Sequence, residues 1–474
     1  MKKESENMLL SFHFSQGLAL LPIILYVLIG GTIMVVFECY SMKVLSLAAL
    51  IALLVGFFFC ANKGKYWQAI VKGLAQYGNA RLLFVFILIG VFSKLLVTGG
   101  IGSGFIWLGV NWGLTGGGFV VFCFLVSALI SIGAGAPIAA MLAVVPIFYP
   151  AGVLLGSDPA VLTGALLSGV FFGDALSPSS QVIHTTIQTQ HDADTNASAP
   201  LLETLKKRLP YVLICGVLSA ILFFLFGTAN AGIGEQANLQ ELCDARGLWM
   251  LIPVVVLLVI CFKTSDLFLA INWSILAGLV TGLLSGCLTF ADFVTISPET
   301  QEIHGLLFDG LNGVTDIVIS TVLLYGLISI AVEGGMVNKC CEFLLAQKAL
   351  STRRGAEIVI SLGISVVNIL LAGCVLPSIL MFKDVSDTIG QRTKVSAVRR
   401  SILLTSMTTN ITAIIPINSA FVMGAITIIA GIASSNSNIP SVTPFEVFMS
   451  TFYCLLLTVV CVIWVVFGVG KDKE

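Results

Sequence analysis

The sequence is poor in charge. Asp, Glu, Lys and Arg make up 10% of its 474 residues, whereas soluble domains carry about 25%. A chain with so few charged side chains cannot cover its surface with polar groups, so a water-soluble globular fold is excluded. The formal net charge is −1 and no basic domain is present, which argues against binding to nucleic acid.

Motifs of enzymes and metal proteins are also missing. The four histidines are scattered, and the chain has no His-Glu-x-x-His, G-x-S-x-G or C-x-x-C motif. Most of the 12 cysteines lie inside apolar runs, where a cysteine acts as a small buried apolar residue. The sequence therefore predicts a protein that is not an enzyme, with no resident cofactor.

Apolar residues are abundant instead: 57% are hydrophobic and the mean hydropathy is +1.02. Apolar runs of about 20 residues are long enough to cross a bilayer as helices. The first run (17–37) lacks a clear signal-peptide cleavage site, so we expect it to remain as a span. These features predict an all-α polytopic membrane protein with about ten transmembrane helices. The predicted spans are 17–38, 44–61, 80–99, 159–187, 208–227, 247–262, 267–289, 315–333, 399–430 and 447–469.

Two further apolar regions, 117–156 and 357–388, have middles rich in Gly or Pro. Each region is either a pair of spans or one re-entrant hairpin. Lys and Arg concentrate in short cytoplasmic loops. If both regions are hairpins and the N-terminus is inside, all but three of the 24 basic residues fall inside. The exceptions are Lys43 and Arg246 outside and Lys94 within a span. Charge therefore favours the hairpins.

The hairpins divide the chain into two halves, 1–230 and 231–474, with the same order of elements. Each half has two spans, an amphipathic stretch (64–78 or about 301–313), a third span, a hairpin, an interrupted span and a last span. Five spans per half is an odd number, so the halves have opposite orientation. Inverted repeats of this kind are typical of secondary transporters.

The interrupted span 159–187 contains Asp174, Ser177, Pro178 and Ser179. Pro178 should break the helix, and broken backbone at membrane depth is tolerated where it lines a cavity or is packed in protein. Asp174 is the only acidic residue predicted deep within a span, where an unpaired carboxylate is costly. It is either a site that binds Na⁺ or a proton, or the N-cap of the second half-helix.

The interrupted span 399–430 contains Pro416 among amides and hydroxyls. The alternative to a binding site here is a kinked helix whose threonines bond to their own backbone. The hairpin tips should reach the same depth, and Asn368 either supplies an amide oxygen or caps a half-helix. The candidate ligands outside the first broken helix are Ser131, Asn368, Thr408, Thr409, Asn410, Asn418 and Ser419. The first tip comprises Ser127, Ser131 and 133–137, and the second comprises Asn368, Gly373, Cys374 and Pro377.

Two more polar residues are candidates for the transport path. Lys94 lies near the outer end of the third span, where it either extends to the interface or pairs with a carboxylate or an anionic substrate. His184 follows the first break and either relays protons or is an ordinary polar residue at a helix end.

At these residues the chain resembles the NhaC-type sodium/proton antiporter family of the ion transporter superfamily. The matching stretches are Gly173 to Pro178, Leu376-Pro377 followed by 381–384, and 415–418. The resemblance implies inverted repeats, paired re-entrant hairpins and cation-coupled exchange, with Na⁺ and H⁺ as coupling ions. It also implies that Asp174 is the family carboxylate, with Ser177 and Asn418 as neighbours.

The chain departs from the family pattern in having fewer acidic residues: Gln181 and Thr405-Ser406 stand where acids are usual. We therefore expect Na⁺/H⁺ exchange at Asp174 by alternating access, or coupled transport of a small organic solute such as a carboxylate or amino acid. The expected surroundings are a bacterial inner membrane with both termini cytoplasmic. Analogy with the superfamily suggests a homodimer.

Overall fold

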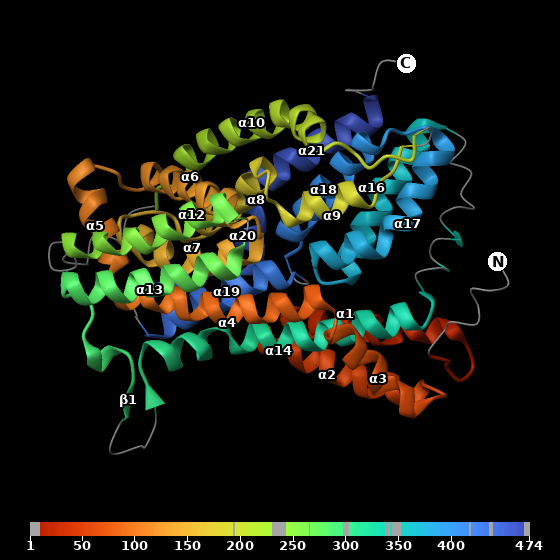
Figure 1. Ribbon diagram of the computed structural model, residues 1–474, viewed down its shortest axis with the longest axis horizontal. Helices are drawn as coiled ribbons and strands as arrows, with labels where there is room; N and C mark the ends of the chain where they lie inside the picture. Colours follow the sequence, from red (N-terminus) through yellow and green to blue (C-terminus); the bar gives the residue numbers. More distant parts are fainter. Residues whose placement is uncertain are drawn as a thin grey trace.

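Apolar runs of the chain form long helices in the computed structural model (Figure 1). The structure describes residues 10–192, 195–229, 243–264, 266–296, 303–336, 339, 342–343, 352–416, 419–435 and 439–468. Within these residues, nine helices are long and apolar enough to cross a membrane, or ten if the bent pair α20 and α21 is one span. The predicted all-α polytopic fold is confirmed.

The elements follow the predicted order in both halves. The first half contains η2 (Gln16–Leu20), α1 (Leu21–Val36), α2 (Met42–Phe59), α3 (Lys63–Leu74), α4 (Tyr77–Thr98), α5 (Ile101–Trp112), α6 (Gly117–Ala134), α7 (Pro137–Leu154), α8 (Pro159–Leu176), α9 (Gln181–Gln188) and α10 (Leu201–Phe226). The second half contains η3 (Ala245–Met250), α12 (Leu251–Thr264), α13 (Leu267–Ser285), η4 (Phe290–Asp292), β1 (Thr295–Ile296), β2 (Ile303–His304), α14 (Leu306–Glu333), α16 (Arg353–Leu370), α17 (Val375–Thr393), α18 (Ala397–Ile414), α19 (Ala420–Ser435), α20 (Pro444–Ser450) and α21 (Phe452–Phe467).

One predicted element is wrong. The stretch 301–313 was expected to be a separate amphipathic segment, but α14 runs without interruption from Leu306. The physical reason is charge pairing. Asp309, in the first turn of α14, pairs with Lys94 of α4 at 3.1 Å, so its charge is balanced without a separate interfacial helix. Helix α5 and the antiparallel pair β1–β2 were not predicted.

Each of the two Gly/Pro-rich regions forms a helical hairpin. In the first hairpin, α6 and α7 are joined at Gly135 and Ala136, and Gly135 adopts a left-handed conformation (φ +59°). In the second, α16 and α17 are joined by 371–374. Each arm of the first hairpin is long enough to span a membrane, so helix length alone does not distinguish a re-entrant hairpin from two spans.

Each tip meets a broken helix part-way along its length, and the re-entrant arrangement stays a prediction. The first tip meets the break after α8, and α9 continues for eight residues beyond it, about 12 Å of helix. The second tip meets the break after α18, and α19 continues for 16 residues, about 24 Å. Both hairpins therefore turn back before the broken helix beside them ends. Helices α6 and α7 lie toward the opposite end of the bundle from α16 and α17 (Figure 1), as inverted halves require.

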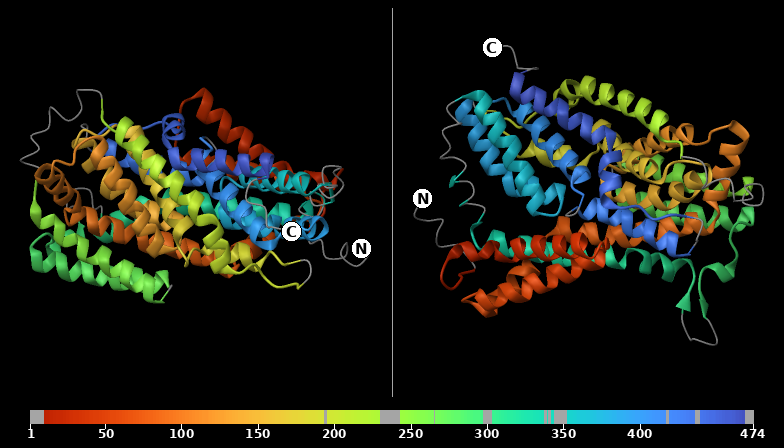
Figure 2. Two further views of the ribbon diagram at one scale, coloured as in Figure 1. Left: turned by 90° about the horizontal axis from the view of Figure 1, so that it is seen from above. Right: turned by 180° about the vertical axis from the view of Figure 1, so that it is seen from behind.

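Contacts between elements repeat across the halves. Helix α6 packs on α8 as α16 packs on α18, and α7 packs on α19 as α17 packs on α9. The central helices α4 and α14 also pack on each other, and Figure 2 shows the same bundle from above and behind. This is the pattern that two interlocked repeats produce. The division near residue 230 stays a prediction, because 230–242 lie outside the described residues.

Glycines let the first hairpin approach its broken helix closely. A Cβ on Gly169 would lie 2.4 Å from the Phe124 carbonyl oxygen, and one on Gly173 would lie 2.1 Å from that of Ala128. Both distances are too short for any side chain, so α6 and α8 touch backbone to backbone, as in small-xxx-small contacts of membrane helices. This contact holds Asp174, the residue after Gly173, against the hairpin.

Candidate functional site

Helix α8 ends at Leu176, two residues before Pro178, and α9 begins at Gln181. The predicted break is therefore present. The Ser177 hydroxyl donates to the Ile132 carbonyl (2.8 Å) and lies 2.9 Å from the Ser179 hydroxyl. Ser180 caps α9 by accepting from the Ile183 amide. The hydroxyls of the break thus hold the tip of the first hairpin.

The second break is also present, between Ile414 and Ala420. The Thr412 hydroxyl lies within hydrogen-bond distance of the Gly373 carbonyl (2.8 Å) and the Asn368 amide oxygen (3.2 Å). The Ser419 hydroxyl donates to the Thr412 carbonyl (2.6 Å). Asn368 thus joins the second hairpin to α18 and caps no helix. Asn418 lies outside the described residues.

The two breaks share one hydrogen-bond arrangement. The backbone amide of Gln181, the first residue of α9, donates to the Gly135 carbonyl at the first tip (3.0 Å). The amide of Ala420, the first residue of α19, donates to the Ala372 carbonyl at the second tip (2.9 Å). Ser180 and Ser419 cap the helices that follow. Each half therefore has the same device: a hairpin tip bonded to the start of the second half-helix.

Asp174 lies at the end of α8 and is 1% exposed. It is not an N-cap, because Ser180 fills that role. Its carboxyl interacts with the Ser180 side chain and with the charge of Arg208 on α10. Oxygen Oδ1 is buried and makes no hydrogen bond within the described part of the chain. An acceptor left in this state is expensive, so Oδ1 is available to a proton or a cation.

Other buried polar atoms on α6, α8 and α18 share this property. The hydroxyls of Ser127, Ser131 and Ser168 have no hydrogen-bond partner among the described residues, and neither polar atom of the Asn410 side chain has one. Ser127 and Ser131 are four residues apart on α6, so they share a face. Ala128, between them, touches Gly173 on α8. Hydroxyl, amide and carboxylate oxygens are the ligands that hard cations accept.

Thr408 and Thr409 are different. The Thr408 hydroxyl bonds to the Leu404 carbonyl and the Thr409 hydroxyl to that of Thr405 (2.9 Å). Both threonine hydroxyls donate to carbonyls of their own helix, as in the back-bonded alternative, and their oxygens keep lone pairs that can accept a cation. Asn410, the next residue, is fully buried and has no partner within the described residues. All three stay candidate ligands.

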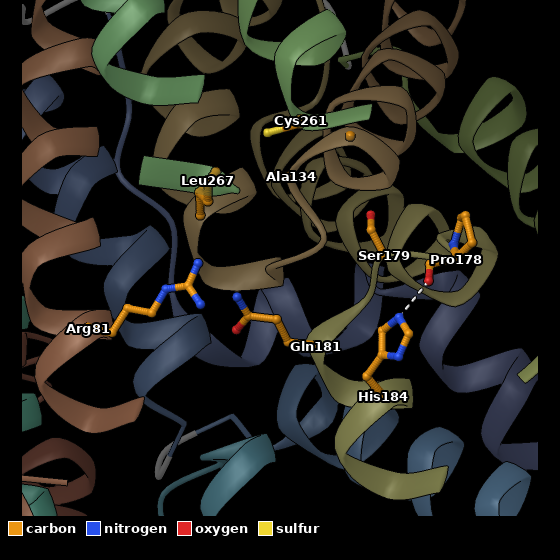
Figure 3. Close-up of a pocket in the computed structure, with 9 residues that line it drawn as sticks. Arg81, Ala134, Pro178, Ser179, Gln181, His184, Cys261 and Leu267 are labelled. Carbon is orange, nitrogen blue, oxygen red and sulfur yellow. Dashed lines mark hydrogen bonds between the residues drawn. The ribbon is translucent and has the colours of Figure 1, made fainter. Parts of the chain in front are cut away.

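Beside the first break lies a cavity of about 350 Å³. Gly133 and Ala134 at the hairpin tip, together with break residues, form one side; α4, α12 and α13 form the other. Figure 3 shows that the side chains of Arg81 and Gln181 point toward each other across it. His184 Nε2 lies 2.9 Å from the Pro178 carbonyl oxygen. The cavity residues are Arg81, Gly133, Ala134, Pro178, Ser179, Gln181, His184, Cys261 and Leu267.

Lys94 does not reach this cavity. Its ammonium group pairs with Asp309 of α14 at 3.1 Å. Of the two alternatives for Lys94, the structure therefore shows pairing with a carboxylate, and the partner is a residue of the protein. The pair joins the two central helices near one end.

Several buried ions were not identified from the sequence. Arg208, Arg399 and Arg400 were assigned to the cytoplasmic surface by charge, but they are 3%, 5% and 0% exposed. Arg399 pairs with Glu357 at 3.2 Å; because Glu357 is 1% exposed, Asp174 is not the only buried acid. The sequence signal for Arg208 is weak, because it is the first residue of the predicted span 208–227, where a cation normally faces water.

The polar network around Arg400 joins the two halves. Its guanidinium donates to a carboxylate oxygen of Asp387 (2.8 Å) and to the His191 carbonyl (2.5 Å). The His191 amide donates to the same carboxylate (2.7 Å). The segment after α9 is thereby fixed to the second arm of the second hairpin.

Comparison with known proteins points to transporters. No family model matches the chain. The malate-2H⁺/Na⁺-lactate antiporter of Bacillus subtilis is 24% identical over 289 residues, 58% of this chain and 60% of the relative. The alignment thus spans less than two thirds of that protein. The arginine/ornithine antiporter of Halobacterium salinarum is 25% identical over 407 residues, 79% of each chain.

The chain is similar to known antiporters. Among solved structures, the YdaH transporter of Alcanivorax borkumensis covers 84% of this chain and 91% of its own, with 13% identity and a TM-score of 0.39. The relatives support a transporter, and the finer resemblance to the NhaC-type family stays a prediction.

Proposed function

We propose that this protein is a secondary antiporter in which Asp174 binds the coupling cation, a proton or Na⁺. The observation that carries the proposal is the buried Asp174 oxygen without a partner among the described residues, beside a helix break held by a hairpin tip. One carboxylate that binds either ion enforces exchange, because the two compete for it. A bacterial inner membrane and a homodimer remain part of the proposal.

Arg208 adds a physical constraint. Its positive charge interacts with the Asp174 carboxyl and partly balances the buried negative charge when the carboxyl is empty. A cation that arrives must compete with this charge, so Asp174 can release it again. Opening and closing would come from movement of the hairpins and broken helices against the central helices α4 and α14.

The test is transport in proteoliposomes. An inward Na⁺ gradient should drive protons out, and Asp174→Asn should abolish this flux. Asp244→Asn is the matched control, since Asp244 is an exposed acid paired with Arg246. If Asp174→Asn transports at the wild-type rate, the proposed role of Asp174 is wrong.

A second candidate is exchange of a small organic solute coupled to the same cation. The two curated relatives favour it, because their names state malate, lactate, arginine and ornithine, all of which carry a carboxylate. Labelled lactate, malate and arginine should then enter proteoliposomes loaded with the same solute. Solute exchange without Na⁺-driven proton flux would select this candidate.

A further inference from the structure

The cavity beside the first break differs in chemistry from the Asp174 site. One side of the cavity belongs to the first hairpin and its broken helix and includes Ala134 and Ser179. The other side belongs to the helices packed opposite and includes Arg81 and Cys261. Asp174 is not among its lining residues. A ligand in this cavity touches both bodies that alternating access would move, so its binding can affect their relative position.

Two side chains that line the cavity, Arg81 and Gln181, have hydrogen-bond donors without a partner among the described residues. The Arg81 guanidinium forms an ion pair with the partly exposed Asp266 carboxylate at 3.7 Å. It makes no hydrogen bond within the described residues, and its Nε is buried without a hydrogen-bond partner there. The Phe268 ring lies 5.5 Å from the guanidinium. The side-chain amide of Gln181 also has no hydrogen-bond partner in the described structure, and it points toward Arg81 (Figure 3).

The charge of Arg81 determines the kind of ligand. A guanidinium repels Na⁺, but its planar donors match a carboxylate. Asp266 offsets the charge only in part, because its side chain is 52% exposed. The other titratable groups lining the cavity are His184 and Cys261, and neither adds negative charge in its neutral form.

The size of the cavity agrees with this chemistry. A volume of about 350 Å³ equals that of roughly a dozen waters at about 30 Å³ each, and lies at the lower end of small-molecule sites. A single ion would leave most of it to water, whereas a small organic acid fits with a few waters.

We propose that this cavity binds the carboxylate of a small organic anion, with Arg81 and Gln181 as its ligands. The proposal rests on the proposed antiport function and gives it a substrate class. Ser177, bonded to the tip of the first hairpin, and Ser179, which lines the cavity, belong to the turn between this anion site and Asp174. The anion and the coupling cation therefore occupy separate sites joined by one helix break.

The test measures the melting temperature of the purified full chain with carboxylate probes: propionate, succinate and alanine, against the uncharged propionamide. At ten times its Kd, a bound probe should raise the Tm by about 2 °C, and propionamide should not. Arg81→Gln should weaken binding at least tenfold, because a charge-assisted hydrogen bond is lost. Gln181→Ala should weaken it less, and Arg246→Gln, an exposed arginine paired with Asp244, should bind as wild type.

Two outcomes would overturn the proposal: no carboxylate stabilises the wild type more than propionamide does, or Arg81→Gln binds as tightly as the wild type. If Arg81→Gln is unfolded, the Gln181→Ala result decides in its place. If no carboxylate binds but a Na⁺ gradient still drives proton flux, the anion site is wrong and the antiport function stands. If carboxylates bind but the protein exchanges no ion or solute, the antiport function is wrong and the anion site stands.

Discussion

At the scale of single residues, the site depends on charges that face each other inside the protein. Asp174 and Arg208 are both almost fully buried and interact electrostatically. They are not within ion-pair distance, because the Arg208 guanidinium bonds to the Ala175 carbonyl instead. Removing one of the two charges therefore costs less than the 3–5 kcal/mol that is typical of a broken buried ion pair. Stability and transport therefore respond differently to these changes.

A double-mutant cycle separates the two effects. We expect Arg208→Gln to lower the free energy of unfolding by about 2 kcal/mol, because the hydrogen bond of its charged group to the Ala175 carbonyl is lost. The double variant Asp174→Asn/Arg208→Gln should regain about 0.5 kcal/mol of it. Transport should be absent from the double variant, since the carboxylate is gone. Melting temperatures and flux in proteoliposomes measure these quantities. Additive effects on stability would show that the two residues do not interact.

Arg400 offers a second residue-scale prediction. The planar Arg400 guanidinium donates one hydrogen bond to Asp387 and another to the His191 carbonyl. A lysine ammonium cannot reach both acceptors at once. Arg400→Lys should therefore destabilise the protein by about 2 kcal/mol, measured as a lower Tm. Lys207→Gln, which removes an exposed helix ion pair, is the control and should change stability by less than about 0.5 kcal/mol.

The sequence identified Asp174 but not its partner, for a physical reason. An acid in the middle of an apolar run can be recognised from the sequence alone, because no neighbouring residue offers a charge or hydrogen bond that would offset the cost of burying it. Arg208 and Arg400 lie near the ends of apolar runs, where a cation normally faces water. Their burial depends on carbonyls and carboxylates distant in the sequence, such as Ala175, His191 and Asp387, which only the fold brings near.

At the scale of elements, proline and glycine were the residues that best predicted where helices break and where hairpins turn. Pro178 and Pro416 mark the breaks, because proline removes a backbone donor wherever it stands. Gly135 and Gly373 turn the hairpin tips with positive φ. The sequence pattern did not show that one long helix begins at Leu306, because the charge of Asp309 makes the start of this helix look like a separate amphipathic segment. Only the fold places Lys94 beside Asp309, and Lys43 beside Asp316 further along the helix.

Gly173 provides the element-scale prediction. Because a Cβ there would lie 2.1 Å from the Ala128 carbonyl oxygen, Gly173→Val should separate α6 from α8 and cost at least about 3 kcal/mol. Tm and the yield of monodisperse protein measure the loss. Gly31→Val is the matched control, because nothing lies within 4 Å of a Cβ at Gly31. A Gly173→Val protein as stable as this control would mean that the two helices are not in backbone contact.

At the scale of the whole molecule, the distribution of Lys and Arg predicted the arrangement that the helices adopt. Helices α5 and α3 lie toward opposite ends of the bundle, and α16 and α17 lie at the α3 end (Figure 1). This agrees with a first hairpin that enters from the outside and a second that enters from the cytoplasm. Which end faces the cytoplasm follows from charge alone, so it requires a direct measurement.

Labelling of single cysteines in intact cells makes that measurement. Thr115 directly precedes the first hairpin and Arg354 lies at the start of the second; both are exposed. In a background with Cys39, Cys243, Cys287, Cys340 and Cys341 changed to serine, Thr115→Cys should react with a membrane-impermeant maleimide. Arg354→Cys should react only after permeabilisation, as should Lys65→Cys on α3, an exposed residue at the predicted inner end. Equal labelling of Thr115→Cys and Arg354→Cys in intact cells would place both hairpins on one side and contradict the inverted arrangement.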